Sequence, residues 1–252
     1  MQYNYQNNNT PQRTLAFDIE TVGVEWEEVS APMQESLQRS VKKNSVTEEE
    51  FVTKMEEAKN NLVFSPLTGK IIALSIYDVE HEAGAVYFEA PSGIPGKTET
   101  YWEEDGVKYF VMSEKEIVTE FWRIAEHYNT FLTFNGHAFD VPYTMMRSAL
   151  HGIKPSKNLM TNRFLSSQKG DARHIDLFDQ FTFYGTLSRK GFSLDGLSSA
   201  FGITSPKAEG VSGDQVGPLF KQGEYLKIAK YNAADSKATG ELYKIWEQYL
   251  KF

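Results

Sequence analysis

The chain has 252 residues, of which 24% are charged and 40% hydrophobic, with a net charge of -8 and no cysteine. This length can bury a sizeable core in one large domain. The absence of cysteine excludes a disulfide scaffold, a cysteine-ligated zinc site, an iron–sulfur cluster and a thiol nucleophile. The negative net charge argues against a protein whose whole surface is basic and binds double-stranded nucleic acid non-specifically. It is compatible with a nucleic-acid enzyme whose active site is rich in carboxylates.

No apolar run in the sequence approaches about 18 residues, so we expect neither a membrane-spanning helix nor a membrane partner. Residues 1–13 are polar and rich in Asn and Gln, and they lack the apolar segment of a secretory signal. We therefore predict a cytoplasmic location, a flexible tail over residues 1–13 and a single domain over residues 14–252.

The expected elements alternate between strands and helices. Thr14–Glu20 (TLAFDIE) predicts a strand, and residues 24–61 are charged, with a Thr47-x-x-Glu50 capping box. We interpret residues 24–61 as an insertion of one or two helices packed beside that strand. Further strands are expected over Lys70–Asp78, Ala85–Ala90, Val107–Met112 and Thr130–Phe134, and helices from Ser113, over Asp140–Leu150 and from Glu224 onward. This order predicts an α/β fold with helices on both faces of a mixed central sheet.

The first candidate motif is the pair Asp18 and Glu20 at the end of the first strand. Side chains two residues apart on a strand point to the same face, so these two carboxylates repel each other. A divalent cation would neutralise them. A solvated strand end explains the pair equally well.

The second motif is the run FNGHAFD, residues 134–140, in which an apolar strand leads into an Asn-Gly turn. Phe139 is expected to anchor to the core, and the Asn135 amide could hold a phosphate or sugar or merely close the turn. Asp140 lies at the start of a helix, where it could serve a site or cap the helix.

The third motif is Tyr231-Asn232-Ala233-Ala234-Asp235. Positions i and i+4 of a helix share a face, so Tyr231 and Asp235 point together. The two alanines would let this helix approach the sheet closely. A surface Tyr–Asp pair is the simpler reading of this motif alone.

Together the motifs supply four acids on three separate segments: Asp18, Glu20, Asp140 and Asp235. Four carboxylates could hold two Mg²⁺ or Mn²⁺ ions about 3.5–4 Å apart, the arrangement that cleaves phosphodiesters. Hard oxygen ligands suit these ions better than zinc.

The order Asp-x-Glu, Asn-x-x-x-Phe-Asp, Tyr-x-x-x-Asp resembles the three motifs of the DEDD 3′→5′ exonuclease superfamily, and the tyrosine marks its DEDDy branch. Phe139–Tyr143 (FDVPY) is similar to the proofreading domain of family B DNA polymerases. Ser193–Leu197 (SLDGL), Lys207 and Gly213–Val216 (GDQV) resemble the stand-alone predicted exonucleases related to that domain. The resemblance implies an RNase H-like fold from Thr14 to Tyr249, with residues 24–61 as the main departure.

The resemblance also implies roles for the motif residues. Asp18 would bridge both metal ions, Glu20 and Asp235 would hold the first, and Asp140 would orient the second through water. Tyr231, with Glu20, would align the attacking water. Asn135, Phe139 and Lys207 are the expected substrate contacts.

The leading hypothesis is therefore a metal-dependent 3′→5′ exonuclease that releases 5′-mononucleotides from single-stranded DNA or DNA 3′ ends. The same chemistry on RNA, an endonuclease sharing the fold and a non-catalytic nucleic-acid-binding module are the alternatives. A separate segment, His174-Ile175-Asp176-Leu177, predicts a strand or helix start in which Asp176 either caps or faces the cleft. The sequence assigns no polymerase or repair partner.

Overall fold

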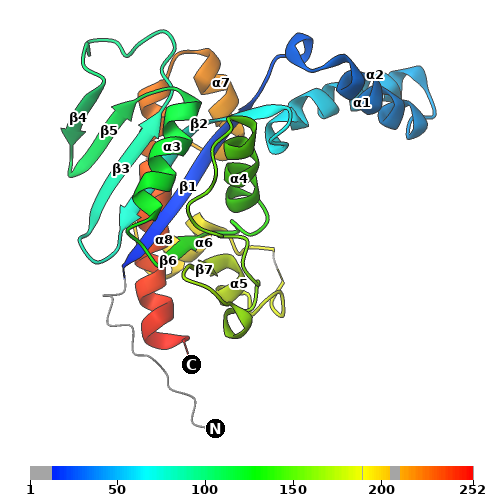
Figure 1. Ribbon diagram of the computed structural model, residues 1–252. Helices are drawn as coiled ribbons and strands as arrows, with labels where there is room; N and C mark the ends of the chain where they lie inside the picture. Colours follow the sequence, from blue (N-terminus) through cyan, green and yellow to red (C-terminus); the bar gives the residue numbers. More distant parts are fainter. Residues whose placement is uncertain (1–12, 189, 205–210, 252) are drawn as a thin grey trace.

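The computed structural model describes residues 13–188, 190–204 and 211–251 (Figure 1). The tail predicted over residues 1–13 therefore lies, apart from Arg13, outside the described residues. Within the described ranges one sheet of seven strands has the order β4-β5-β3-β2-β1-β6-β7. Its strands are β1 (Thr14–Gly23), β2 (Gly69–Asp78), β3 (Ala83–Phe88), β4 (Tyr101–Glu104), β5 (Val107–Val111), β6 (Thr130–Thr133) and β7 (Arg173–Asp176).

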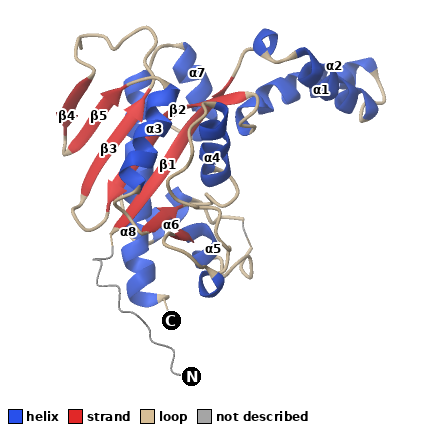
Figure 2. Ribbon diagram, in the orientation of Figure 1, coloured by secondary structure: helices blue, strands red, loops and turns tan. Residues whose placement is uncertain are grey.

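The sheet is mixed. The pairs β1–β2, β2–β3 and β4–β5 are antiparallel, whereas β1–β6, β6–β7 and β3–β5 are parallel. The α-helices are α1 (Ala31–Lys43), α2 (Glu48–Asn60), α3 (Glu114–Ala125), α4 (Asp140–Leu150), α5 (Leu177–Phe181), α6 (Leu194–Ala200), α7 (Val216–Lys221) and α8 (Tyr225–Tyr249). Short 3₁₀ turns are η1 (Trp26–Glu28), η2 (Asn61–Phe64), η3 (Leu165–Ser167) and η5 (Gly213–Gln215). Helices flank a mixed sheet (Figure 2), which confirms the predicted fold class.

The alternation of side chains along β1 sorts the two faces of the sheet. Leu15, Phe17 and Ile19 belong to one apolar cluster, which also contains Phe121 of α3 and Val141 of α4. The residues between them point to the opposite face, where α8 packs on β1, β2 and β3. The core therefore consists of two layers, and β1 is buried on both sides.

Strand β1 is longer than the sequence indicated. The predicted strand ended at Glu20, but pairing with β2 continues to Gly23 after a register shift between Glu20 and Thr21. The shift leaves Ile72 of β2 as an extra residue, since Glu20 pairs with Ala73 and Thr21 with Ile71. Irregularities of this kind re-aim side chains beside functional sites. The two carboxylates thus lie inside a paired strand, and the solvated strand end is the wrong interpretation.

Residues 24–61 contain η1, α1 and α2, but these helices do not pack beside β1 as expected. They pack against each other and form an arm that extends away from the sheet (Figure 1). The turn that follows them, η2, makes the contact with β1, where Leu62 is buried. Helices α1 and α2 have few apolar side chains. These are enough to pack the two helices against each other, but they do not form a second apolar face that could pack on the sheet.

Among the residues that the structure describes, no helix combines the length and apolar character needed to cross a membrane.

Candidate active site

The face of the sheet under α8 carries two apolar clusters with a polar gap between them. Ala16 of β1 lies in the cluster that contains Leu242 near the C-terminal end of α8. Val22 lies in the cluster that contains Ile228 near its N-terminal end. Asp18 and Glu20 occupy the same face of β1 between Ala16 and Val22, so the gap in the apolar surface follows directly from the sequence alternation.

Three carboxylates meet in this gap. Asp18, Glu20 and Asp235 each offer an oxygen, and these oxygens lie within 4.8 Å of one another. Asp235 comes from the middle of α8, more than 200 positions away in the chain. Glu20 and Asp235 are buried, and Asp18 is half-buried.

Asp140, the fourth acid, comes from α4 and contacts the backbone of β1. It is the first residue of α4, and its Oδ1 accepts a hydrogen bond of 3.2 Å from the backbone N–H of Ile19, between Asp18 and Glu20. Burial raises the pKa of Asp140 to about 7, and the charges of Asp176 and Asp235 act in the same direction. The Asp140 carboxylate thus does more than begin a helix, because its hydrogen bond to Ile19 joins α4 to β1 between Asp18 and Glu20.

Tyr231 lies one helical turn before Asp235, as the spacing predicted. Its hydroxyl is hydrogen-bonded to the Asp235 carboxylate. Burial, followed by the charges of Asp235, Glu20 and Asp18, raises the pKa of Tyr231 well above its ordinary value near 10. The phenol therefore keeps its proton at neutral pH and can donate a hydrogen bond.

The electrostatics of the cluster favour a cation. Burial raises the pKa of Asp18 well above its ordinary value, and the charges of Asp140, Asp235 and Glu20 add to the effect. Burial and the charges of Asp235 and Asp140 do the same to Glu20. Like charges so close together cannot all ionise without compensation. A set of hard carboxylate oxygens at this spacing fits Mg²⁺ or Mn²⁺.

Two neutral residues that sequence reasoning did not select complete the cluster. Asn232 donates from Nδ2 to Asp18 Oδ2 at 2.7 Å, and Ser75 Oγ donates to the backbone oxygen of Asn232, also at 2.7 Å. Asn232 could have been found from its i, i+3 spacing to Asp235. Ser75 could not, because its relevance depends on the cross-strand register that pairs it with Asp18.

Asn135 lies at the turn between β6 and α4, in a left-handed backbone conformation with φ 65°. The buried carboxylate of Asp176 accepts the backbone N–H groups of Asn135 at 2.8 Å and of His137 at 3.0 Å. It also accepts the Phe178 N–H at 3.0 Å and so caps α5. A Cβ on Gly136 would meet Thr133 Oγ1 at 2.3 Å, so the turn requires glycine there. Asp176 therefore caps a helix and fixes the turn before Asp140.

Phe139 is half-buried and contacts two other aromatic rings. Its centroid lies 5.2 Å from that of Tyr143 and 6.4 Å from that of Phe64. Phe64, in η2, is 65% exposed, and nothing in the sequence motifs marked it. Lys207, the third expected substrate contact, lies outside the described residues.

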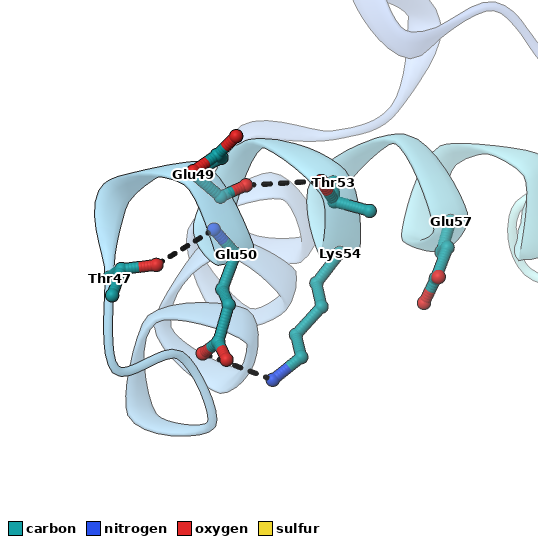
Figure 3. Close-up of a pocket in the computed structure, with 6 residues that line it drawn as sticks. All are labelled: Thr47, Glu49, Glu50, Thr53, Lys54 and Glu57. Atoms are coloured by element: carbon teal, nitrogen blue, oxygen red, sulfur yellow. Dashed lines mark hydrogen bonds and ion pairs between the residues drawn. The ribbon is translucent and has the colours of Figure 1, made fainter.

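A surface hollow of about 340 Å³ lies on the arm, and none of the candidate site residues lines it (Figure 3). Its lining residues are Thr47, Glu49, Glu50, Thr53, Lys54 and Glu57. These side chains largely satisfy each other: Thr47 Oγ1 accepts the Glu50 N–H at 3.2 Å, and Lys54 pairs with Glu50 at 3.7 Å. The hollow reflects an open helix surface, so the candidate site remains the acidic gap.

Curated relatives with sequence similarity are polymerases. The DNA polymerase of Thermococcus sp. (strain GE8) is 29% identical over 195 residues, covering 69% of this chain and 11% of that protein. The DNA polymerase of Thermococcus gorgonarius is 28% identical over 195 residues, covering 69% of this chain and 24% of that protein. The chain thus spans no more than about a quarter of the length of either polymerase.

A solved structure shares the fold. The family B DNA polymerase of the hyperthermophilic archaeon Pyrobaculum calidifontis superposes with a TM-score of 0.57 at 14% identity, covering 94% of this chain and 25% of that chain. This similarity supports the fold assignment.

The family model described as "Predicted 3'-5' exonuclease related to the exonuclease domain of PolB" matches residues 93–250. This stretch contains Asp140, Tyr231 and Asp235, while Asp18 and Glu20 precede it. The match confirms the resemblance that the three motifs indicated. The chain belongs to the family of predicted 3′-5′ exonucleases related to the exonuclease domain of family B DNA polymerases.

Proposed function

We propose that this chain is a metal-dependent exonuclease that removes 5′-mononucleotides from the 3′ end of single-stranded DNA or of DNA ends. The observation that carries the proposal is the convergence of Asp18, Glu20 and Asp235 oxygens within 4.8 Å, with Asp140 bonded to the backbone between the first two. We also propose that residues 14–252 act as one exonuclease domain in which residues 24–61 are a helical insertion.

Asp18, Glu20, Asp140 and Asp235 would hold two Mg²⁺ or Mn²⁺ ions. Ions bound there would supply an activated water molecule and charge neutralisation at the leaving 3′ oxygen. The site fits such ions because burial, and after it the neighbouring negative charges, raise the pKa values of Asp18, Glu20 and Asp140, and a divalent cation would relieve the repulsion among these carboxylates.

The remaining residues of the site orient the reactants. Tyr231 donates a hydrogen bond from a phenol that remains protonated, and Glu20 accepts one, so together they can align an attacking water. Asn135 and Phe139 belong to the turn that leads into Asp140 and are the proposed contacts to the terminal nucleotide. We assign phosphate contact to Lys207.

The experiment that tests this function compares the wild-type chain with Asp18→Asn on 5′-labelled single strands in Mg²⁺ or Mn²⁺. We expect a ladder that shortens from the 3′ end, nucleoside 5′-monophosphates as products and no cleavage in EDTA. Asp18→Asn should lower the rate by about 10³-fold, the scale for removing one essential electrostatic group.

The matched control is Asp171→Asn, since Asp171 is an exposed acid that pairs with Lys157 on the surface at 2.9 Å. Its rate should equal that of the wild-type chain. Matched RNA oligonucleotides distinguish the alternative substrate. Undiminished release by Asp18→Asn would contradict the proposed site, and tight strand binding without hydrolysis in either metal would favour a non-catalytic module.

A further inference from the structure

A closed set of hydrogen bonds links β1, β2 and α8 directly beneath the acidic cluster. Asp18 and Ser75 are cross-strand partners in the β1–β2 register. Ser75 Oγ donates to the Asn232 backbone oxygen at 2.7 Å, and Asn232 Nδ2 donates to Asp18 Oδ2 at 2.7 Å. The Ser75 side chain of β2 thus binds the backbone of α8, and the Asn232 side chain of α8 binds the Asp18 carboxylate of β1.

Both neutral members of this set are inaccessible to water. Ser75 and Asn232 are each 0% exposed, so their hydrogen bonds do not compete with solvent. Hydrogen bonds to a charged acceptor in such surroundings are stronger than neutral ones. The remaining acceptor of the side chain, Asn232 Oδ1, is buried and finds no hydrogen-bond partner among the residues that the structure describes. A buried amide with one unsatisfied atom lowers the stability of the fold. The contact of Asn232 with Asp18 offers the compensating benefit.

The chemistry of the amide matches the needs of Asp18. An ionised carboxylate accepts hydrogen bonds only, and a neutral amide supplies a donor without adding a charge. Asn232 Nδ2 donates to Asp18 Oδ2 at 2.7 Å and so gives this carboxylate a hydrogen bond that ionised neighbouring acids cannot supply. A lysine or arginine in this position would also favour the carboxylate, but its charge would compete with a metal ion.

We propose that Asn232 is a positioning residue for metal capture: its amide commits one oxygen of Asp18 to α8 and so orients the carboxylate for divalent ions. The inference rests on the proposed metal-dependent function. It extends that function to a residue that touches neither substrate nor metal. Because α8 also carries Tyr231 and Asp235, the same contact fixes these side chains relative to β1.

The helix lies close enough to the sheet for this contact to be rigid. A Cβ on Gly240 of α8 would meet Tyr77 Cδ1 of β2 at 2.5 Å, so the helix backbone nearly touches the strand side chain there. The Ala residues of the third motif were expected to permit this approach; both are half-buried, and Ala233 packs against an apolar core cluster.

The test uses Asn232→Ala and Asn232→Leu, which both lack the donor but differ in volume. Mn²⁺ binding is measured by calorimetry without nucleic acid, and steady-state kinetics are measured on a single-stranded oligonucleotide. Both variants should weaken Mn²⁺ binding and lower kcat by about 10–100-fold, the scale of a lost hydrogen bond to a charged group. KM for the oligonucleotide should stay within about twofold, since a general packing defect would also disturb substrate binding.

Ser198→Ala is the control, because Ser198 is another buried polar side chain, on α6, and its hydroxyl has no hydrogen-bond partner within the described part of the chain. It should leave both measurements unchanged. If the Ala variant does not fold, the Leu variant carries the test because it retains side-chain volume. Wild-type-like Mn²⁺ binding and kcat in an Asn232 variant would overturn the inference. A wild-type chain that neither binds Mn²⁺ nor releases nucleotides would instead overturn the proposed function.

Discussion

Phe64 and Phe139 meet edge to face, with their ring centroids 6.4 Å apart and their planes at 68°. Phe139 immediately precedes Asp140, and Phe64 ends the turn that follows the arm. Tyr143 and Thr21 donate hydrogen bonds to the backbone oxygen of Val63 at 3.2 and 3.3 Å, so the residue before Phe64 is fixed to both α4 and β1. An exposed aromatic ring therefore contacts the residue that directly precedes Asp140.

Phe64→Ala should impair binding of single-stranded substrate. Stacking of a base on an aromatic ring contributes about 1–3 kcal/mol, so we expect KM to rise by roughly 5–100-fold with kcat nearly unchanged. The measurement is steady-state release from a single-stranded oligonucleotide. A substrate with an abasic 3′ end should show a smaller difference between the two proteins.

The control for this prediction is Tyr249→Ala, which removes a ring that is 63% exposed near the C-terminal end of α8. It should leave KM unchanged. An equal KM for Phe64→Ala and the wild-type chain would mean that the exposed ring does not contact the substrate.

Tyr231→Phe should lower kcat by about 10–100-fold without changing KM for the oligonucleotide. The substitution removes only the hydroxyl, which is hydrogen-bonded to Asp235 and positioned to orient a water. Since the pKa of Tyr231 is raised well above 10, the rate should show no alkaline limb from this group up to pH 10 in either protein. A limb that disappears in Tyr231→Phe would identify the phenol as a base and contradict this assignment.

Metal-free stability should fall as the pH rises through neutrality. The folded-state pKa of Asp140 is about 7, raised mainly by burial, against an ordinary value of 3.8. Between these values the folded chain binds more protons than the unfolded chain, so its free energy of unfolding decreases with rising pH. Asp140→Asn should therefore stabilise the metal-free protein at pH 8, by up to about 4 kcal/mol, and much less at pH 5.

Urea unfolding in EDTA at the two pH values measures this difference, and Asp171→Asn serves as the exposed control with no such pH dependence. Added Mn²⁺ binds ionised carboxylates, so it should raise the unfolding midpoint of the wild-type chain more at pH 8 than at pH 5. Equal stabilisation by Asp140→Asn at both pH values would show that the carboxylate is not held in the protonated form.

Glu114 should be the acid whose loss most damages the fold. Its Oε1 accepts the Ile71 N–H and Arg147 Nε–H, each at 2.7 Å, and its Oε2 contacts Arg147 Nη2 at 2.6 Å and His151 Nε2 at 2.8 Å. These bonds join α3 to β2 and α4. Glu114→Ala leaves a partly buried guanidinium without its partner, so we expect a loss of about 3–5 kcal/mol.

Chemical denaturation near pH 7 measures that loss. Burial alone would raise the pKa of Glu114, but the bonds from Arg147, His151 and Ile71 outweigh it and lower the pKa. The stabilisation is therefore present above the ordinary pKa and decreases as the pH falls through the lowered one. Glu126→Ala, an exposed acid at the end of the same helix, should change stability little. A similar small effect for Glu114→Ala would refute the structural role.

The sequence by itself determined most of the long elements, though not β4, α6 or α7, and it determined the residue pairs that local geometry controls. Alternation along β1 placed Asp18 and Glu20 on one face, and helical spacing placed Tyr231 beside Asp235, because periods of 2 and 3.6 follow from backbone geometry alone. The order of the three motifs was enough to indicate the family.

Only the tertiary structure decided which distant groups meet and which neutral residues support them. Ser75 and Asn232 acquire their roles from the β1–β2 register and from the closeness of α8. Phe64 meets Phe139 because the backbone before it is fixed to α4 and β1. These relationships depend on packing between segments far apart in the chain, and no local pattern of side chains encodes a distance across the core.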